Sequence, residues 1–325
     1  MTSDDMILFS FDFDGKGGGK QIHGSDIRQK LKASELAWVH LDATHPEARG
    51  WLMENVDYLD HIVLDALLME ETRPRMMQFK DGLLLILRGA NLNENAEPED
   101  MISLRIWIDP HRIITMRRRK LKAVQDIKQK LETGAGPTDA GDFLATLTLR
   151  LFERMEPVIV DLNERVDDVE ERILEDPEPE ERSEIIDLRK MAIILRRYIL
   201  PQREVITELR NCEQAWLETH HRRHLQEAHD RVTRYSEDLD MVRERAQIVK
   251  DELSNMLADK LNKNMYILSV IAAIFLPLGF LTGLLGGNVG GIPGADDHNA
   301  FLIFCGLLVV IVAFQILIFK KMKWF

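Results

Sequence analysis

Two uncharged apolar stretches near the end of the chain limit its fold more than any other feature. They lie at residues 265–285 and 300–319, and no Asp, Glu, Lys or Arg occurs between positions 264 and 295. A helix needs about 20 apolar residues to cross the hydrocarbon core of a bilayer, so each stretch is long enough. The sequence predicts a water-soluble part followed by two transmembrane helices. Two helices cannot enclose a water-filled path, so any conduit requires several copies around an axis.

Lysines on the outer sides of both stretches predict the orientation in the membrane. Cytoplasmic flanks are enriched in Lys and Arg, and the loop between the stretches, residues 286–299, contains neither. We therefore expect both termini, with the basic tail at 320–325, in the cytoplasm and the loop outside. The acidic start lacks the positive charge of a signal peptide. The flanking basic residues are Lys260, Lys263, Lys320, Lys321 and Lys323.

Several functional classes lack support in the sequence. Cys212 lies in the polar part and Cys305 in the second apolar stretch, so no disulfide is expected and a reducing cytosol fits. The segment Gly-Lys-Gly-Gly-Gly-Lys at 15–20 is followed by Gln21, where a phosphate loop requires Ser or Thr. We interpret it as a hairpin turn. No nucleophile–base set or catalytic carboxylate pair occurs, so neither an enzyme nor a bound cofactor is expected.

Residues 1–135 predict an α+β soluble domain. Apolar side chains alternate at residues 7–13, which is typical of a strand, and a second strand is expected at 36–41. Two hairpins are predicted at 76–87 and 102–116, and apolar residues at helical spacing predict helices at 45–69 and 121–131.

Residues 136–221 predict an acidic pair of cytoplasmic helices. The first should run from 142 to 175 and the second from 179 to 211, with a kink at Pro201. Thirteen acidic residues and three arginines lie between positions 161 and 187, which leaves a net charge of −10 in a chain of −12.

A heptad pattern then predicts a cytoplasmic stalk at 222–264. It continues without Gly or Pro into the first transmembrane stretch, so one helix of roughly 95 Å is expected over 222–285. The apolar heptad positions are Leu225, Ala228, Val232, Tyr235, Leu239, Val242, Ala246, Val249, Leu253 and Met256.

Two sets of polar residues near the stalk are candidate metal sites. Four acidic residues recur every seven positions opposite the heptad seam: Asp230, Glu237, Glu244 and Asp251. Around a symmetry axis they would form acidic rings that attract divalent cations, although a solvated helix face is the more ordinary explanation. The second set comprises His220, His221, His224 and Cys212. It would form a regulatory metal site, or it is only the polar start of a helix.

One face of the first transmembrane helix is a candidate pore wall. Its residues are Met265, Leu268, Ala272, Leu276, Gly279 and Gly283. The glycine pair would permit close helix packing, and the apolar residues would close a gate by dewetting. Asn288 follows the helix and would offer a ring of neutral oxygens to a hydrated cation, or serve only as a turn residue.

The segment Gly286-Gly287-Asn288 resembles the Gly-x-Asn motif of the CorA-type metal ion transporters. The preceding segment at 275–283, the tail, and the segments at 72–75 and 87–93 are also similar, and Val289-Gly-Gly-Ile-Pro-Gly resembles the ZntB-like zinc-transporter subgroup. The magnesium transporters of the family carry Met where this chain has Gly287. The resemblance implies a funnel-shaped homopentamer with an α/β/α sandwich in a bacterial inner membrane. It implies a pore lined by the first span, with Gly-x-Asn at the outer mouth.

The resemblance further implies transport of zinc, with cobalt, nickel and cadmium as other cargoes, through proton-coupled uptake. The alternatives are zinc efflux or a magnesium or cobalt channel. His298, Asp296 and Asp297 are the titratable groups nearest the spans. A second hypothesis is a membrane-anchored interaction or sensor protein with a coiled-coil tether. The expected partners are other copies of the chain, lipid, divalent metal ions and protons, without nucleic acid.

Overall fold

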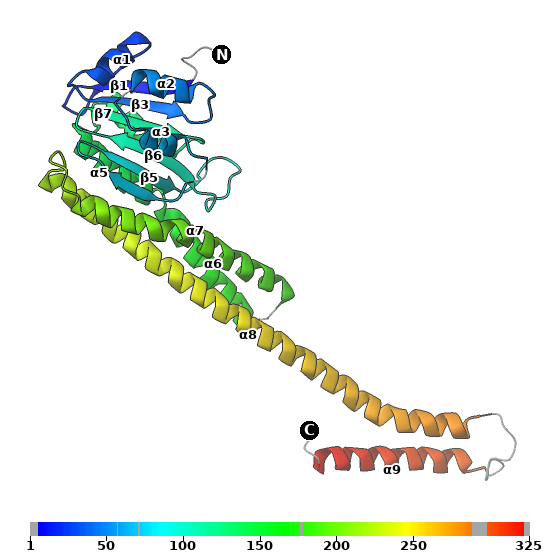
Figure 1. Cartoon of the computed structure of the whole chain (residues 1–325). Coiled ribbons are helices and arrows are strands. Elements are labelled where there is room, and N and C mark those ends of the chain that lie inside the picture. Colours follow the sequence, from blue (N-terminus) through cyan, green and yellow to red (C-terminus); the bar gives the residue numbers. More distant parts are fainter. Residues whose placement is uncertain (1–5, 57, 71, 176–177, 288–297, 322–325) are drawn as a thin grey trace. The chain divides into compact units, whose positions relative to one another are not determined.

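The computed structural model describes residues 6–321, except 57, 71, 176–177 and 288–297. The chain divides into two compact units, Met1–Asp251 and Glu252–Phe325. The first unit contains a mixed β-sheet with helices on both faces and a group of long helices (Figure 1). The second unit contains the two apolar helical segments.

The sheet has the strand order β2-β1-β3-β7-β6-β5-β4. Only β3 and β7 pair in parallel among the described strands, and this pairing joins an N-terminal part of the sheet to a C-terminal meander. The strands predicted at 7–13 and 36–41 and both hairpins are confirmed, whereas the short, polar β2 was missed. The strands are β1 Ile7–Phe13, β2 Gly19–Gln21, β3 Ala37–Asp42, β4 Arg75–Gln78, β5 Leu83–Gly89, β6 Ile102–Ile108 and β7 Arg112–Arg117.

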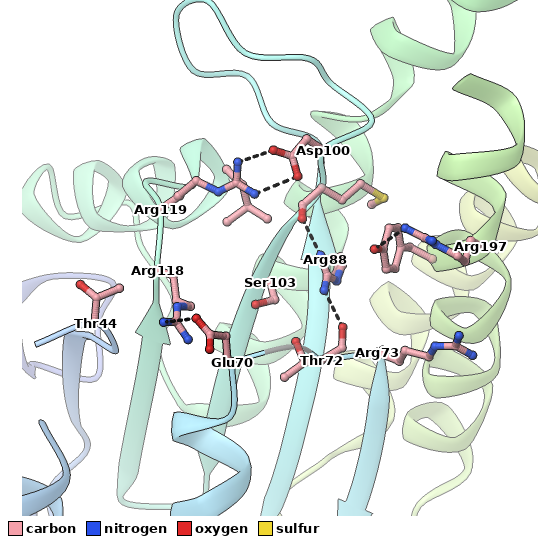
Figure 2. A pocket seen from close by; sticks show the side chains of 13 residues that line it. Thr44, Glu70, Thr72, Arg73, Arg88, Asp100, Ser103, Arg118, Arg119 and Arg197 are labelled. Carbon is pink, nitrogen blue, oxygen red and sulfur yellow. Dashed lines mark hydrogen bonds and ion pairs between the residues drawn. The ribbon is translucent and has the colours of Figure 1, made fainter. Parts of the chain in front are cut away.

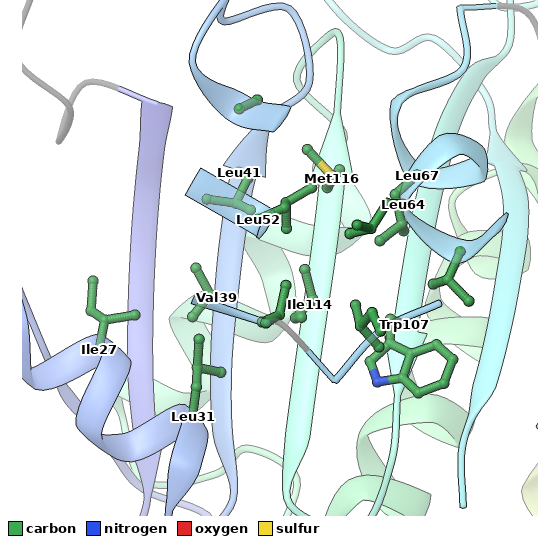
Figure 3. Packing of buried hydrophobic residues seen from close by; sticks show 14 of the residues in the cluster. Ile27, Leu31, Val39, Leu41, Leu52, Leu64, Leu67, Trp107, Ile114 and Met116 are labelled. Atoms are coloured by element: carbon green, nitrogen blue, oxygen red, sulfur yellow. The ribbon is translucent and has the colours of Figure 1, made fainter. Parts of the chain in front are cut away.

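Three short helices cover one face of the sheet (Figure 3). They are α1 Ser25–Lys32, α2 Ala48–Asn55 and α3 His61–Leu68. Leu52 of α2 and Leu67 of α3 are fully buried in this core. The single helix expected over 45–69 is wrong, because the chain ends α2 and begins α3 at the new cap Asp60, whose carboxylate accepts from the Ile62 N–H.

The other face of the sheet packs against α4 Lys122–Glu132 and α5 Ala140–Glu153. The Phe143 ring of α5 lies edge-on to Trp38 of β3, with ring centroids 4.8 Å apart. Trp38 Nε1 donates to Thr115 Oγ1 at 2.7 Å, and Thr115 also contacts the buried His40 ring at 2.8 Å. Helices on both faces confirm the predicted α/β/α sandwich.

Three long helices complete the first unit and lie side by side in Figure 1: α6 Glu156–Glu175, α7 Pro179–Asn211 and the start of α8 Thr219–Leu285. The long helix expected over 142–175 is divided into α5 and α6. Pro157 supplies the reason, because proline lacks the N–H that a helix interior requires but fits the first turn of a new helix. The continuous helix predicted over 222–285 is confirmed as α8.

The heptad seam of α8 packs against helices of the same chain. Its positions from Leu225 to Val249 are at most 6% exposed. Ion pairs tie the rim of the seam to α6 and α7, among them Arg245 to Asp167 at 2.5 Å and Arg196 to Asp240 at 2.6 Å. The seam therefore needs no partner chain to be buried.

Candidate functional site

The two apolar segments of the second unit have the character of membrane spans. Both α8 and α9 Ala300–Lys321 are long and apolar enough to cross a bilayer, and within their apolar windows only 6% and 0% of residues are buried. A core helix of a soluble protein would be mostly buried instead. Apolar side chains exposed over this length favour a lipid or partner environment.

α9 runs antiparallel to the end of α8 and covers one side of it. Leu278 of α8 lines a groove with Val309 and Val312 of α9, and the Gln315 side chain reaches Ala273 of α8. At 100° per residue, the candidate pore face is centred about 100° from Ala273 and about 120° from Leu278, roughly opposite the midpoint between these two residues. The described part of α9 therefore leaves this face uncovered within one chain.

The candidate pore residues are accordingly open. Met265 and Leu268 are each 66% exposed and Leu276 is 71% exposed. Ala272 is partly exposed, and an added Cβ on Gly279 or Gly283 would have no neighbour within 4 Å. The close helix approach expected at the glycine pair does not occur between α8 and the described part of α9.

A polar contact between the two spans compensates for a proline inside α8. Pro277 has no N–H, so the carbonyl of Ala273, four residues earlier, lacks its usual helical donor. Gln315 Nε2 of α9 donates to that carbonyl at 3.4 Å. Neighbouring helices commonly supply such a donor where a proline interrupts a membrane helix. Sequence reasoning missed Gln315, although a lone amide in an apolar span was a usable signal.

The first two residues of the predicted outer mouth differ in the space around them. A Cβ on Gly286 would lie 2.5 Å from the Thr282 carbonyl oxygen, which accepts from the Gly286 N–H at 2.8 Å. A Cβ on Gly287 would lie 3.7 Å from its nearest neighbour, an ordinary contact. Glycine is thus required by the backbone only at the first position. Asn288 lies outside the described residues.

The acidic stripe occupies the exposed side of α8. Asp230, Glu237, Glu244 and Asp251 are all exposed. Asp251 accepts from the Gln247 amide at 2.7 Å and lies 3.1 Å from Lys250 Nζ. The Gln247 amide, and then Lys250, hold the pKa of Asp251 below its ordinary value. The stripe therefore faces away from the packing of α8 against α6 and α7.

The predicted histidine cluster is brought together only in part. His220 and His221 lie beside Asp139, with ligand atoms within 4.8 Å of one another. His224 is exposed, and Cys212 is buried with its thiol on the Leu209 carbonyl, so neither joins this group. Burial raises the pKa of the Cys212 thiol, which disfavours the thiolate that a metal would need.

The hydrogen bonds of His221 match a capping role. Its Nδ1 accepts from the Glu218 N–H at 3.1 Å, and its buried Nε2 lies 3.2 Å from Asp139 Oδ1 without a hydrogen bond to a described residue. Asp139 itself caps α5 by accepting from the Asp142 N–H. The two side chains thus lie at the starts of α5 and α8, and Nδ1 is already occupied by a backbone donor, so only Nε2 is left for a metal. Asp139 was missed because it lies about 80 residues from the histidines.

Comparisons with known proteins cover nearly the whole chain. The model of the family described as "CorA-like Mg2+ transporter protein" matches residues 33–321. The chain is 37% identical to the zinc transport protein ZntB of Yersinia enterocolitica, over 98% of this chain and 95% of that protein. It is 36% identical to the divalent cation transporter CmaX of Pseudomonas aeruginosa, over 98% of this chain and 96% of that protein.

Solved structures agree with these matches. The structure of full-length CmaX superposes with a TM-score of 0.85 at 36% identity, covering 99% of both chains. The CorA magnesium transporter of Methanocaldococcus jannaschii superposes with a TM-score of 0.78 over 100% of both chains, at 20% identity. The second likeness concerns the fold alone.

Proposed function

We propose a function on the premise that this chain belongs to the CorA-like Mg2+ transporter family. The chain is a membrane transporter of divalent metal cations and not an enzyme. Beyond this, we propose that zinc is the preferred cargo and that five copies form one conduit along a central axis. The zinc transport function named for the relative from Yersinia enterocolitica supports this choice of metal.

The observation that carries the proposal is the uncovered face of α8. Within one chain, α9 packs on the side of Ala273 and Leu278, and the opposite face, with Leu276 at 71% exposure, has no described neighbour. Two helices cannot enclose water, so a conduit places this face of several copies around the axis. The apolar gate would consist of Met265 and Leu268.

Gly287 leaves the middle position of the motif without a side chain, although a Cβ would fit there. The Gly-x-Asn loop would then present Asn288 as a ring of neutral amide oxygens, which can hold a hydrated cation without stripping its water. We further propose that both termini are cytoplasmic in a bacterial inner membrane, since α9 ends in Lys320 and Lys321. Proton-coupled uptake is the direction proposed.

The decisive experiment is ion flux in liposomes that contain the purified full chain. Zinc, cobalt, nickel and magnesium are supplied separately, with and without a pH gradient. Zinc uptake should exceed magnesium uptake and should rise when the outside is acidic. Asn288→Ala should abolish zinc flux while the protein still assembles, and Asn211→Ala, at the exposed end of α7, serves as the matched control. Equal zinc flux in both variants would show that Asn288 does not form the outer mouth.

A cysteine pair tests which face lines the conduit. In a background without Cys212 and Cys305, Leu276→Cys places a thiol on the proposed pore wall, and Leu278→Cys places one on the side covered by α9. A water-soluble thiol reagent should block zinc flux through the first variant only. Block of both variants, or of the second alone, would contradict the assignment.

The tether hypothesis is less well supported by the same structure. Its motivation was an apolar heptad seam that needed partner helices, yet α6 and α7 of the same chain bury that seam. It predicts no ion flux in liposomes.

A further inference from the structure

A cleft in the first unit is lined by an unusual excess of arginine. Its volume is about 810 Å³, and it lies where β5 and β7 end, beside α7 and the segment that follows α3 (Figure 2). Small-molecule sites commonly occupy about 300–1,000 Å³. The charged residues of the lining are Arg73, Arg88, Arg118, Arg119, Arg197, Glu70 and Asp100.

The charge of the lining is opposite to that of the chain. Five guanidinium groups face two carboxylates, an excess of three positive charges in a protein of net charge −12. The two ion pairs that involve these carboxylates are solvent-accessible. Arg118 pairs with Glu70 at 3.1 Å and Arg119 with Asp100 at 2.5 Å, and the two carboxylate side chains are 82% and 61% exposed. The single contact of Arg118 with Glu70 is weak and exchanges easily with another anion. Arg119 holds Asp100 more firmly, because its Nη1 and Nη2 each donate to one carboxylate oxygen.

One arginine of the cleft is held rigidly. Arg88 Nη1 donates to the Met101 carbonyl at 2.6 Å and Nη2 to the Thr72 carbonyl at 2.5 Å. Its guanidinium also lies 4.2 Å from the centroid of the Tyr198 ring. Its Nε is buried and has no partner among the described residues. A fixed guanidinium loses little entropy when it binds an oxyanion.

A sixth arginine, Arg105, lies next to the lining, where its Nη2 donates to the carbonyls of Met69 and Glu70. The Arg105 side chain is fully buried on β6, and its Nε and Nη1 have no hydrogen-bond partner among the described residues. Burial, followed by the repulsion of Arg118 and Arg88, lowers the pKa of Arg105 to about 10. Its charge therefore adds to the positive field without a facing carboxylate, and an anion in the cleft would relieve the repulsion.

We propose that this cleft binds a small soluble anion that carries at least two phosphate groups. Two phosphates carry about three negative charges at pH 7, which matches the excess on the lining. Guanidinium groups fit phosphate oxygens through paired N–H donors. Arg73 and Arg197 are exposed at the cleft and have no salt bridge to a described residue. Arg197 Nη2 donates to the Tyr198 hydroxyl at 2.8 Å, a neutral partner that an anion would replace. The site goes beyond transport and does not depend on which cation is carried.

Calorimetric titration of the full chain in detergent tests the proposal. Pyrophosphate, ATP, inorganic phosphate and citrate are compared at fixed ionic strength with EDTA present, so that no metal ion bridges probe and protein. Pyrophosphate or ATP should bind at least about tenfold more tightly than inorganic phosphate or citrate. Comparison of the first two probes distinguishes a bare diphosphate from a nucleotide. Binding of citrate equal to that of both would overturn the proposal.

A pair of double variants locates the site. Arg73→Gln with Arg197→Gln should weaken pyrophosphate binding about tenfold or more. Arg28→Gln with Arg49→Gln removes the same charge from exposed positions outside the cleft and should leave binding unchanged. Equal weakening in both double variants would mean that only net charge matters, and no weakening in either would place the ligand elsewhere.

Chemical protection of the unchanged protein gives an independent measurement. Pyrophosphate should slow the modification of Arg73 and Arg197 by phenylglyoxal, mapped by mass spectrometry, and should not slow it at Arg28. If no phosphate probe binds and the cleft instead cross-links to the acidic α6 of another copy, the cleft is a protein interface and the proposal is wrong.

Discussion

Replacing Gln315 with methionine should weaken the packing of α9 on α8. Methionine has nearly the same length and flexibility as glutamine but lacks the amide that donates to the Ala273 carbonyl at 3.4 Å. Pro277 provides no helical N–H for that carbonyl, so the variant leaves it unpaired in an apolar span. An unpaired carbonyl in hydrocarbon is costly, and the two helices should separate more easily.

The magnitude follows from the length of the bond. Hydrogen bonds between membrane helices contribute about 0.6 kcal/mol on average and up to about 1.7 kcal/mol. A donor–acceptor distance of 3.4 Å is longer than the usual ~2.9 Å, so we expect about 1 kcal/mol or less. Gln315 Oε1 is buried without a partner among the described residues, and its removal offsets part of that loss. The single variant alone is therefore ambiguous.

A double-mutant cycle with Pro277→Ala resolves the ambiguity. Alanine at 277 restores a helical N–H to the Ala273 carbonyl, so Gln315→Met should then lose nothing at that atom. The coupling energy between the two substitutions should be about 0.6–1 kcal/mol.

Unfolding in SDS can be followed by energy transfer between dyes on Lys263→Cys and Lys320→Cys. These variants are made in a background without Cys212 and Cys305, and labelled chains are diluted into unlabelled ones. A coupling energy of zero within error would refute the role assigned to Gln315.

Three further outcomes are expected. Burial lowers the pKa of His40 to about 3 from 6.5. Between pH 3 and pH 6.5 the unfolded chain therefore binds a proton on His40 that the folded chain does not bind. The free energy of unfolding in urea should then fall with decreasing pH by up to about 1.4 kcal/mol per unit, and His40→Asn should reduce that slope. Gln202→Leu leaves the N–H and C=O of Arg88 unpaired, which should lower the free energy of unfolding by about 2–4 kcal/mol in the same assay. Gly286→Ala should impair assembly on size-exclusion chromatography because its Cβ meets a carbonyl, whereas Gly287→Ala should not.

The features predicted correctly depend on local signals. Strand β1 shows period-two alternation, both hairpins have recognisable turns, and α8 has an unbroken helical pattern from the heptads through the first span. The two helices that were predicted too long are each divided at a single residue. Asp60 and Pro157 each begin a new helix within an apolar pattern that continues across the break. Periodicity alone does not detect a change of helix axis.

The arginine cleft was not foreseen, because its arginines come from four separate segments of the first unit. Arg73 precedes β4, Arg88 lies near the end of β5, Arg118 follows β7 and Arg197 belongs to α7. Each is an ordinary charged residue in the sequence. The antiparallel pairing of β6 with β5 and β7, and the packing of α7 on β4 and β5, bring them to one end of these strands.

The sequence by itself determined the division into a charged soluble part and two apolar spans, because hydrocarbon tolerates few charges and a helix needs a minimum length to cross it. It also determined the long stalk, since nothing along it interrupts the helical hydrogen bonds. The tertiary structure decided which polar groups meet across the chain, as Gln315 meets Ala273 and His221 meets Asp139. Those pairings depend on helix register and on the angle between elements, which arise from packing and leave no local pattern.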